Sequence, residues 1–403
     1  MRFALVSNVL PPDDNSHAAV IYRLLSDLDP RRYCLLSSGS GGRAGEPGRL
    51  PGTLHCLPPA PQLTRGYRMG LRWWRERVNL GVGAIARART IAAILRSEGC
   101  DAVVVCTGGQ EILDFPAAFL ASRWTGARFY AYLLDQYGQM VAHVTGEHMF
   151  ARLEPMVLKR ATGVIAPNEF LRDELRRRHQ VDAAVIHNPC DLERYRGPAA
   201  AEAADDAIAR GGERRIVYTG AVGPLHYGAF RALLAAMAAL DRPDLRLHVY
   251  TPQPPERLDR EGIRGPVVLH PPQPLSAMAA LQQQADVLFL PLALDSRDPD
   301  IVRTAAPGKL GEYLAAGRPI LVHAPSDSFV ASYFREHGCG VVVDRDDPGE
   351  LAAALSSILG DAALRTRLRA RGWARAQADF DVHRARRQFA RVIGLAEPTT
   401  ADL

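Results

Sequence analysis

Short apolar runs alternate with longer amphipathic stretches along the first half of the chain. The apolar runs predict buried strands at residues 2–7, 33–37, 101–106, 128–134, 163–167 and 183–187. The amphipathic stretches predict helices, among them 16–28, 84–99 and 168–178. Continuous apolar strands separated by helices are typical of a parallel sheet that helices cover on both faces.

The same alternation returns after a pause of different composition. Residues 196–213 are rich in alanine, glycine and acidic side chains, lack an apolar stripe and therefore predict a linker. Beyond the linker the predicted strands are 215–220, 245–251, 266–270, 286–292, 318–323 and 340–344. The predicted helices there are 226–240, 275–284, 307–316, 327–337 and 348–359. The sequence thus predicts an α/β fold class with two doubly wound, Rossmann-like domains facing each other across a cleft.

The chain length agrees with this division, because 403 residues are enough for two hydrophobic cores. We expect an N-terminal domain over 1–195, the linker 196–213, and a C-terminal domain over 214–378. The remaining residues, 379–403, are expected to form a helix and tail that can pack back on the N-terminal domain.

Composition narrows the class of protein. Apolar residues make up 47% and charged residues 23% of the chain, as in soluble globular proteins. The amino-terminal apolar run is too short for a signal peptide or membrane span, and no other stretch is expected to reach spanning length. The six cysteines form no CxxC pair and no metal-ligand spacing, so we expect reduced cytoplasmic thiols and no metal. The net charge of +5 is compatible with nucleic acid, an anionic membrane or merely scattered arginine.

Lysine is almost absent from the chain. Of the 49 lysine and arginine residues only Lys159 and Lys309 are lysines, so all the others are arginines. An ammonium is a compact point charge, whereas a guanidinium is a planar fork. Lys309 is therefore a candidate for a site that a fork would not fit.

The segment 304–323, TAAPGKLGEYLAAGRPILVH, surrounds this lysine. Pro307 suits the first position of a helix, and Gly308 allows a ligand to approach the first turn. Lys309 and Glu312 share a helix face, and a solvated pair of this kind contributes about 0.2–0.5 kcal/mol. A lysine in the first turn loses about 0.3–1 kcal/mol to the helix dipole, so the pair does not explain its position. A bound phosphate would explain the position of Lys309, because a charge-assisted hydrogen bond contributes about 1.5–3 kcal/mol.

A glycine turn follows the first predicted strand of the second domain. Gly220 and Gly223 lie between the strand 215–219 and a helix expected to begin near His226. A strand, a glycine turn and a helix form a phosphate cradle from backbone N–H groups at the carboxyl end of a sheet. Tight strand-to-helix turns use glycine for other reasons as well, so both interpretations stay open.

Together these motifs resemble a known family. The segment VIHNPCDLERY (185–195) precedes the linker, and the glycine turn, ADVLFLPL (285–292) and PGKLGEYLAAGRPIL (307–321) follow it in order. The arrangement resembles the two-domain GT-B glycosyltransferases, specifically the retaining family four (glycosyl transferases group 1) enzymes of surface polysaccharide synthesis. The resemblance covers nearly the whole chain and is strongest over 163–345.

The resemblance implies a nucleotide-diphosphate sugar as donor, retention of configuration and no metal or other cofactor. It places Glu312 at the ribose hydroxyls of the nucleotide. It places the backbone from Gly308 to Leu310, with Lys309, beside the diphosphate, and Gly220 in the turn that faces it. As a catalytic residue, Lys309 would stabilise the departing charge, to which such preorganised donors contribute about 2.7–4 kcal/mol each.

The sequence departs from the family pattern at three positions. Thr304 stands where many members have a first glutamate, and Ala221 and Tyr227 stand where an arginine and a lysine are usual. We expect Lys309 and Arg303 to supply the phosphate cations instead. These departures favour either a different donor or a degenerate site.

The first domain also lacks the usual glycine-rich loop, which residues 10–19 replace. Asn15 and the two residues after it are expected to cap a helix that faces the cleft. His17 and Asp135 are our candidate catalytic residues on the acceptor side. Asp135 follows a predicted strand, where a helix-capping role is an equal alternative.

Other motifs have simpler explanations or competing ones. The acid pair in DPD (298–300) matches a metal site of another glycosyltransferase fold but is better explained as a solvated loop. His143 and His148 lack the spacing of a helical zinc pair. Residues 63–80 interleave five arginines with Tyr, Trp and Trp, which suits a membrane surface, single-stranded nucleic acid or a structural helix.

We therefore predict a cytoplasmic glycosyltransferase at the inner face of the membrane, contacting it through 63–80. It would move a sugar from a nucleotide-diphosphate donor to a glycan or lipid-linked acceptor in polysaccharide or glycoconjugate synthesis, without nucleic acid as a partner. The alternatives are a sugar-nucleotide epimerase of the same architecture and a catalytically inactive scaffold that binds sugar nucleotides.

Overall fold

The computed structural model describes residues 1–13, 15–39, 46, 48–59, 72–108, 112–134, 137, 153–195, 212–296 and 298–395. Within 72–108, the side chains are described from residue 78 onward. Contacts divide the chain into two compact units. The first unit is Met1–His187 with Ala385–Leu403, and the second unit is Asn188–Arg384. The predicted domain boundaries and linker stay predictions, because 196–211 lie outside the described residues.

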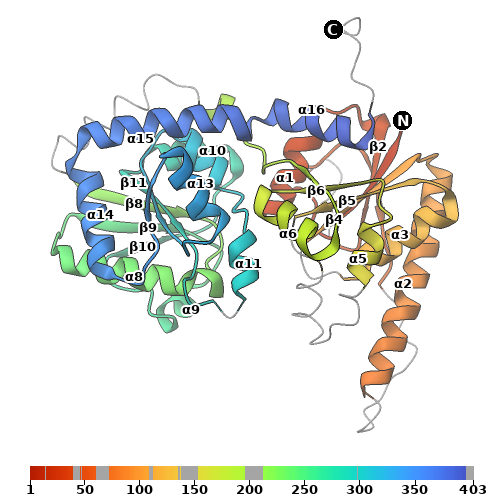
Figure 1. Cartoon of the computed structure of the whole chain (residues 1–403), viewed down its shortest axis with the longest axis horizontal. Coiled ribbons are helices and arrows are strands. Elements are labelled where there is room, and N and C mark those ends of the chain that lie inside the picture. The colour runs from red at the N-terminus through yellow and green to blue at the C-terminus, as the bar shows by residue number, and fades with distance from the viewer. Residues whose placement is uncertain are drawn as a thin grey trace, which may run out of the picture. The chain divides into compact units, whose positions relative to one another are not determined.

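The first unit contains a parallel sheet in the order β3-β2-β1-β4-β5-β6-β7 (Figure 1). Its strands are β1 (Phe3–Val6), β2 (Tyr33–Ser37), β3 (Thr53–Cys56), β4 (Ala102–Thr107), β5 (Arg128–Leu133), β6 (Gly163–Ala166) and β7 (Ala184–Val185). Its helices are α1 (Ser16–Leu25), η1 (Pro30–Arg32), α2 (Arg72–Ser97), α3 (Asp114–Thr125), α5 (Leu153–Leu158), α6 (Glu169–His179) and most of α16 (Val382–Ile393).

Alternate residues of the central strand β1 enter two different cores. Ala4 and Val6 join the core on the side of α2 and α3. Phe3 and Leu5 join the core on the side of α1, to which α16 contributes Phe389, whose ring lies 6.1 Å from that of Phe3. Because β1 is buried on both faces, its sequence is an unbroken apolar run.

The second unit repeats this plan with a parallel sheet in the order β10-β9-β8-β11-β12-β13. Its strands are β8 (Arg214–Thr219), β9 (Leu245–Tyr250), β10 (Val267–His270), β11 (Val287–Pro291), β12 (Ile320–His323) and β13 (Val341–Val343). Its helices are η3 (Leu192–Tyr195), α8 (Pro224–Leu240), α9 (Pro255–Arg260), α10 (Leu275–Gln283), α11 (Pro299–Thr304), α12 (Leu310–Ala315), α13 (Phe329–His337), α14 (Pro348–Gly360), α15 (Ala362–Arg375) and a π-helical segment, Ala376–Phe380.

Each sheet starts at its centre and grows outward in both directions. In the first unit β1 pairs with both β2 and β4, and in the second β8 pairs with both β9 and β11. The predicted fold class of two doubly wound, Rossmann-like sheets is thereby confirmed. Ligands of such sheets bind at the carboxyl ends of the strands where the strand order reverses, which in the second unit means the ends of β8 and β11.

One predicted helix begins later than its sequence suggested. The stretch 307–316 becomes α12, which starts at Leu310 with Lys309 as its N-cap. Pro307 is therefore not the first helical residue, and it accepts a hydrogen bond from the N–H of Leu310 in a tight turn instead. The side chain of Asn188 donates to Ala306 O at 2.9 Å and holds the residue before this turn outside the helix.

The expectation that no stretch reaches membrane-spanning length is wrong for α2. Its window Val78–Ser97 has a mean hydropathy of 1.4 and the length of a span, and 39% of that window is buried. A core helix passes the same test of length and composition, and α2 is held to α3 by a buried ion pair in which Arg87 Nη1 lies 2.8 Å from Asp114 Oδ1. Length and apolar composition alone are weak evidence of a span.

Candidate functional site

The carboxyl end of β8 brings Gly220 and Lys309 into contact. Gly220 directly follows β8 and has a φ of +120°, a conformation that side chains with a Cβ rarely adopt. A Cβ at this position would also lie 3.2 Å from Lys309 Nζ and 3.3 Å from its Cε. Glycine is thus required here by the backbone and by the lysine.

The Lys309 ammonium is held by an aromatic side chain from β8. Its Nζ donates to Tyr218 Oη at 3.0 Å and lies 4.1 Å from the centroid of the same ring. Tyr218 in turn donates to Ala221 O at 2.6 Å, which fixes the turn after β8. Burial lowers the pKa of Lys309 to about 8, and the charge of Glu312 opposes this shift without cancelling it.

His226 adds a neutral donor beside this lysine. It lies in the first turn of α8, and its Nδ1 accepts from the N–H of Gly223 at 3.2 Å. Burial, with the positive charge of Lys309, lowers the pKa of His226 to about 3. The imidazole is therefore neutral near pH 7, and since Nδ1 is the acceptor, Nε2 carries the proton.

Glu312 belongs to a hydrogen-bond network of side chains from several elements. The carboxylate accepts from Gln282 Nε2 at 3.0 Å, and the same amide nitrogen lies 3.3 Å from Thr219 Oγ1 at the end of β8. Gln282 is fully buried and accepts from Tyr195 Oη at 2.9 Å. The neighbouring Tyr313 Oη accepts from the Thr219 N–H at 3.0 Å. These bonds hold α12 at the carboxyl end of β8 and leave Glu312 only 8% exposed.

The other predicted donor-binding residues have different surroundings. Arg303 Nε lies 3.9 Å from Asp300 Oδ1, and Thr304 Oγ1 donates to Asp300 O at 3.0 Å within α11. Leu310 is a core side chain with 1% exposure, so only its backbone can face a ligand. Gly308 lies in the turn before α12. Gly223 caps α8, and a Cβ there would meet nothing within 4 Å.

Position 227, where the resemblance led us to expect a lysine, acquires a cation from another helix. Tyr227 Oη accepts from Arg257 Nε at 3.1 Å, and Arg257 belongs to α9, which follows the adjacent strand β9. Sequence reasoning missed this arginine and the roles of Tyr218 and His226. For Tyr218 and His226, the signal available in the sequence was their position at the end of a predicted strand and just after the glycine turn.

In the first unit, His17 lies at the corresponding end of the sheet. As predicted, Asn15 caps α1, and it does so by accepting from the His17 N–H at 2.9 Å. Gly108, next after β4, has a φ of +147°, and a Cβ there would lie 2.5 Å from His17 Nδ1. The imidazole thus rests on the turn after β4. Asp135, His143 and His148 lie outside the described residues, as do residues 63–71.

Comparison with known proteins identifies the class. Residues 213–361 match the family described as Glycosyl transferases group 1. This stretch contains Gly220, Lys309 and Glu312, so these side chains lie in a glycosyl transferases group 1 domain, and the chain is a glycosyltransferase. The family resemblance drawn from the motifs is confirmed at this level. No curated protein matches the chain in sequence.

Solved structures share the fold of the whole chain. Anabaena HepE, crystallised with UDP and glucose, has a TM-score of 0.69 at 14% identity, covering 98% of this chain and 100% of its own. Sucrose-phosphate synthase of Thermosynechococcus elongatus has a TM-score of 0.69 at 16% identity, covering 97% and 98%. A UDP-forming trehalose-phosphate synthase of Burkholderia xenovorans, crystallised with glucose-6-phosphate, has a TM-score of 0.64 at 16% identity, covering 98% and 100%. The two-domain GT-B fold is common to all of them.

The two glycines of the β8 turn provide a matched test of this geometry. We expect Gly220→Ala to destabilise the second unit by about 1–3 kcal/mol, because the new Cβ meets a positive φ and the Lys309 side chain. Gly223→Ala should change stability by less than about 0.5 kcal/mol, since a Cβ there meets open space. Hydrogen exchange of β8 peptides, followed by mass spectrometry, measures both, and equal effects would contradict the geometry.

Proposed function

We propose that this glycosyltransferase transfers a sugar, with retention, from a nucleotide-diphosphate donor to a glycan or lipid-linked acceptor. The observation that carries the proposal is the partly desolvated Lys309 ammonium held beside Gly220 at the carboxyl end of β8. Anabaena HepE, which has the same fold, was crystallised with UDP-glucose, and this supports a diphosphate donor. We propose no metal or cofactor in the transfer.

Three groups around the β8 turn favour a diphosphate. The ammonium of Lys309 supplies a positive charge whose cost of burial an anion would offset. The Nε2–H of His226 supplies a neutral donor, and the amino end of α8, where the helix dipole is positive, lies at the same turn. When the sugar leaves, negative charge grows on the diphosphate. Each preorganised donor directed at that charge contributes about 2.7–4 kcal/mol to the barrier reduction.

Glu312 suits the ribose of the nucleotide. A carboxylate accepts hydrogen bonds from two hydroxyls, and Gln282 fixes its orientation before the nucleotide arrives. Because Glu312 sits one helical turn from Lys309, the ribose and the diphosphate would be bound by one short segment. Arg303 and the backbone of Gly308 and Leu310 complete the proposed donor site.

We assign the acceptor side to the first unit. His17 rests on Gly108 at the carboxyl end of the first sheet, where doubly wound folds bind ligands. An imidazole there can exchange a proton with an acceptor hydroxyl. Asp135 is the second residue proposed for this side.

The departures from the family pattern favour one rival function, an inactive scaffold that binds sugar nucleotides. Thr304 carries an uncharged hydroxyl, which donates to Asp300 O within α11, so this position supplies no carboxylate for the donor sugar. The test is turnover. We expect one nucleotide sugar in a panel to stabilise the full chain, by about 2.7 kcal/mol at a hundred times its Kd. Release of nucleoside diphosphate only with an acceptor establishes the transferase. Binding without turnover indicates the scaffold, and isomerisation of the donor sugar without acceptor indicates the epimerase.

Lys309 and Glu312 should affect different parts of the nucleotide. We expect Lys309→Met to weaken binding of the nucleoside diphosphate about 10- to 100-fold, the loss of a charge-assisted hydrogen bond of about 1.5–3 kcal/mol, and to leave the nucleoside unaffected. Glu312→Gln keeps the shape that Gln282 contacts and should weaken nucleoside and diphosphate alike, by about fivefold to tenfold. Calorimetric titration, with UDP tried first, measures all four affinities. Unchanged diphosphate affinity in both variants would remove this site assignment.

Donor binding should depend on pH through Lys309, whose pKa is about 8 in the free protein. A bound diphosphate raises this pKa, so affinity is full while the ammonium is protonated and falls as pH rises above about 8. For one proton the fall approaches tenfold per pH unit. Titrations between about pH 7 and pH 9 measure the slope. Lys309→Met serves as the control, because it retains only the pH dependence of the ligand, and identical slopes would contradict the proposal.

We further propose that the protein works at the cytoplasmic face of an anionic membrane in polysaccharide synthesis. The amino-terminal part of α2 projects beyond the described ribbon of the first unit (Figure 1), Ile85 is 44% exposed, and residues 63–80 carry five arginines.

We expect Ile85→Glu to reduce cosedimentation with phosphatidylglycerol vesicles. Leu275→Glu, which alters an equally exposed leucine of α10 in the second unit, should not. Equal binding by both variants would argue against this surface.

A further inference from the structure

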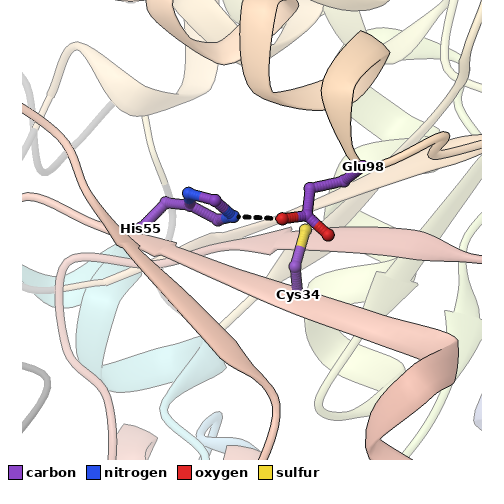
Figure 2. A group of neighbouring side chains, drawn as sticks. All are labelled: Cys34, His55 and Glu98. Atoms are coloured by element: carbon purple, nitrogen blue, oxygen red, sulfur yellow. Dashed lines mark hydrogen bonds and ion pairs between the residues drawn. The ribbon is translucent and has the colours of Figure 1, made fainter.

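A cysteine, a histidine and a glutamate meet beneath the end of α2 in the first unit. Cys34 comes from β2, His55 from β3, and Glu98 directly follows α2. Figure 2 shows the His55 ring and the Glu98 carboxylate facing each other next to the Cys34 sulfur. One ligand atom from each of these side chains lies within 4.8 Å of the other two, and His55 Nε2 is 2.7 Å from Glu98 Oε1.

Cys100 places a second sulfur beside Cys34, outside the group of three residues whose ligand atoms lie within 4.8 Å of one another. Its Sγ lies 3.7 Å from Cys34 Sγ. Two thiolates bound to one Zn²⁺ at about 2.3 Å in a tetrahedron are about 3.8 Å apart, so the observed separation fits a shared zinc ion. Sulfur, imidazole nitrogen and carboxylate oxygen are the three ligand types that zinc accepts.

A disulfide explains the two sulfurs less well. Cys34 lies on β2 and Cys100 leads into β4, and β1 lies between these strands. Their sulfurs are 3.7 Å apart, whereas a disulfide bond is about 2.05 Å long, so the two thiols are not bonded and would have to approach each other to form one. A metal bridges the two sulfurs without moving the backbone.

Arg2 completes the charge balance of such a site. Its Nη2 forms an ion pair with Glu98 Oε2, while Glu98 Oε1 faces His55. A neighbouring hydrogen-bond donor of this kind orients a ligating carboxylate. Two thiolates, one carboxylate and a neutral imidazole carry three negative charges, which Zn²⁺ and Arg2 together neutralise. The exposed fractions of the His55 and Glu98 side chains, 27% and 17%, leave a path for the metal.

We propose that Cys34, His55, Glu98 and Cys100 bind one structural zinc ion in the first unit. Four protein ligands close the coordination sphere, which is the arrangement of structural rather than catalytic zinc. Cys34 is the second residue of β2 and Cys100 precedes β4, so the sulfurs lie toward the amino ends of these strands, away from the carboxyl ends where ligands bind. The ion would join the edge strand β3 to β2, α2 and β4.

The test uses the full chain, purified without a histidine tag, reduced, freed of metal with a chelator and titrated with Co²⁺ and Zn²⁺. We expect about one equivalent of Co²⁺ to produce the charge-transfer absorption of two thiolates, Zn²⁺ to displace it, and Zn²⁺ to raise the melting temperature. Cys100→Ser should lose about half of that absorption. His55→Gln should bind zinc at least about tenfold more weakly.

Cys56→Ser is the matched control. Cys56 is the exposed neighbour of His55 on β3, and alternation along the strand directs it to the opposite face of the sheet. The Cys56→Ser variant should bind Co²⁺ and Zn²⁺ as the unaltered chain does. Buried Cys34→Ser tests the second thiolate, and if it does not fold, Cys100→Ser and His55→Gln decide the question. The proposal is overturned by absence of charge-transfer absorption, by unaltered metal binding in both Cys100→Ser and His55→Gln, or by a Cys34–Cys100 disulfide in the isolated protein.

Discussion

The second unit depends on one lysine ammonium withdrawn from water at the end of a strand. Among the described residues Lys309 forms no ion pair, and burial outweighs the attraction of Glu312, so its pKa falls to about 8. Tyr218 Oη accepts a hydrogen bond from Lys309 Nζ, and the ammonium lies over the Tyr218 ring, while Gly220 leaves space for the lysine side chain. A bound anion, which we propose is the diphosphate of the donor, would offset the cost of holding a cation there.

The rest of the site follows from the need to hold that cation in place. Tyr218 spans from the ammonium to Ala221 O and so couples the lysine to the glycine turn. Gln282 and Tyr313 fasten α12 to Thr219 at the end of β8. Because α12 is only six residues long, these side-chain bonds, more than its own backbone, determine where it lies.

The sequence predicted the buried strands well, missed the partly exposed edge strand β3, and predicted the site only in part. Buried parallel strands are continuous apolar runs, so β1 and β8 are visible without any structure. Lys309 was found because a cation is unusual in the first turn of a helix, Gly220 because it lies in a strand-to-helix turn, and Glu312 through the family resemblance. Tyr218, His226 and Arg257 were not, because their roles come from contacts between elements far apart in sequence. The start of α12 was misplaced because Asn188 holds Ala306 from a segment that precedes the linker.

The sequence by itself determined the fold class, the resemblance to glycosyltransferases and the lysine that had to be explained, since hydrophobic periodicity and motif spacing are local properties. Only the tertiary structure decided what surrounds that lysine, how far its pKa falls, and that His226 is neutral, because desolvation depends on which atoms enclose a group. It alone also brought the sulfurs of Cys34 and Cys100 to 3.7 Å, since β2, which carries Cys34, and β4, which Cys100 precedes, become neighbours of β1 only when the sheet forms.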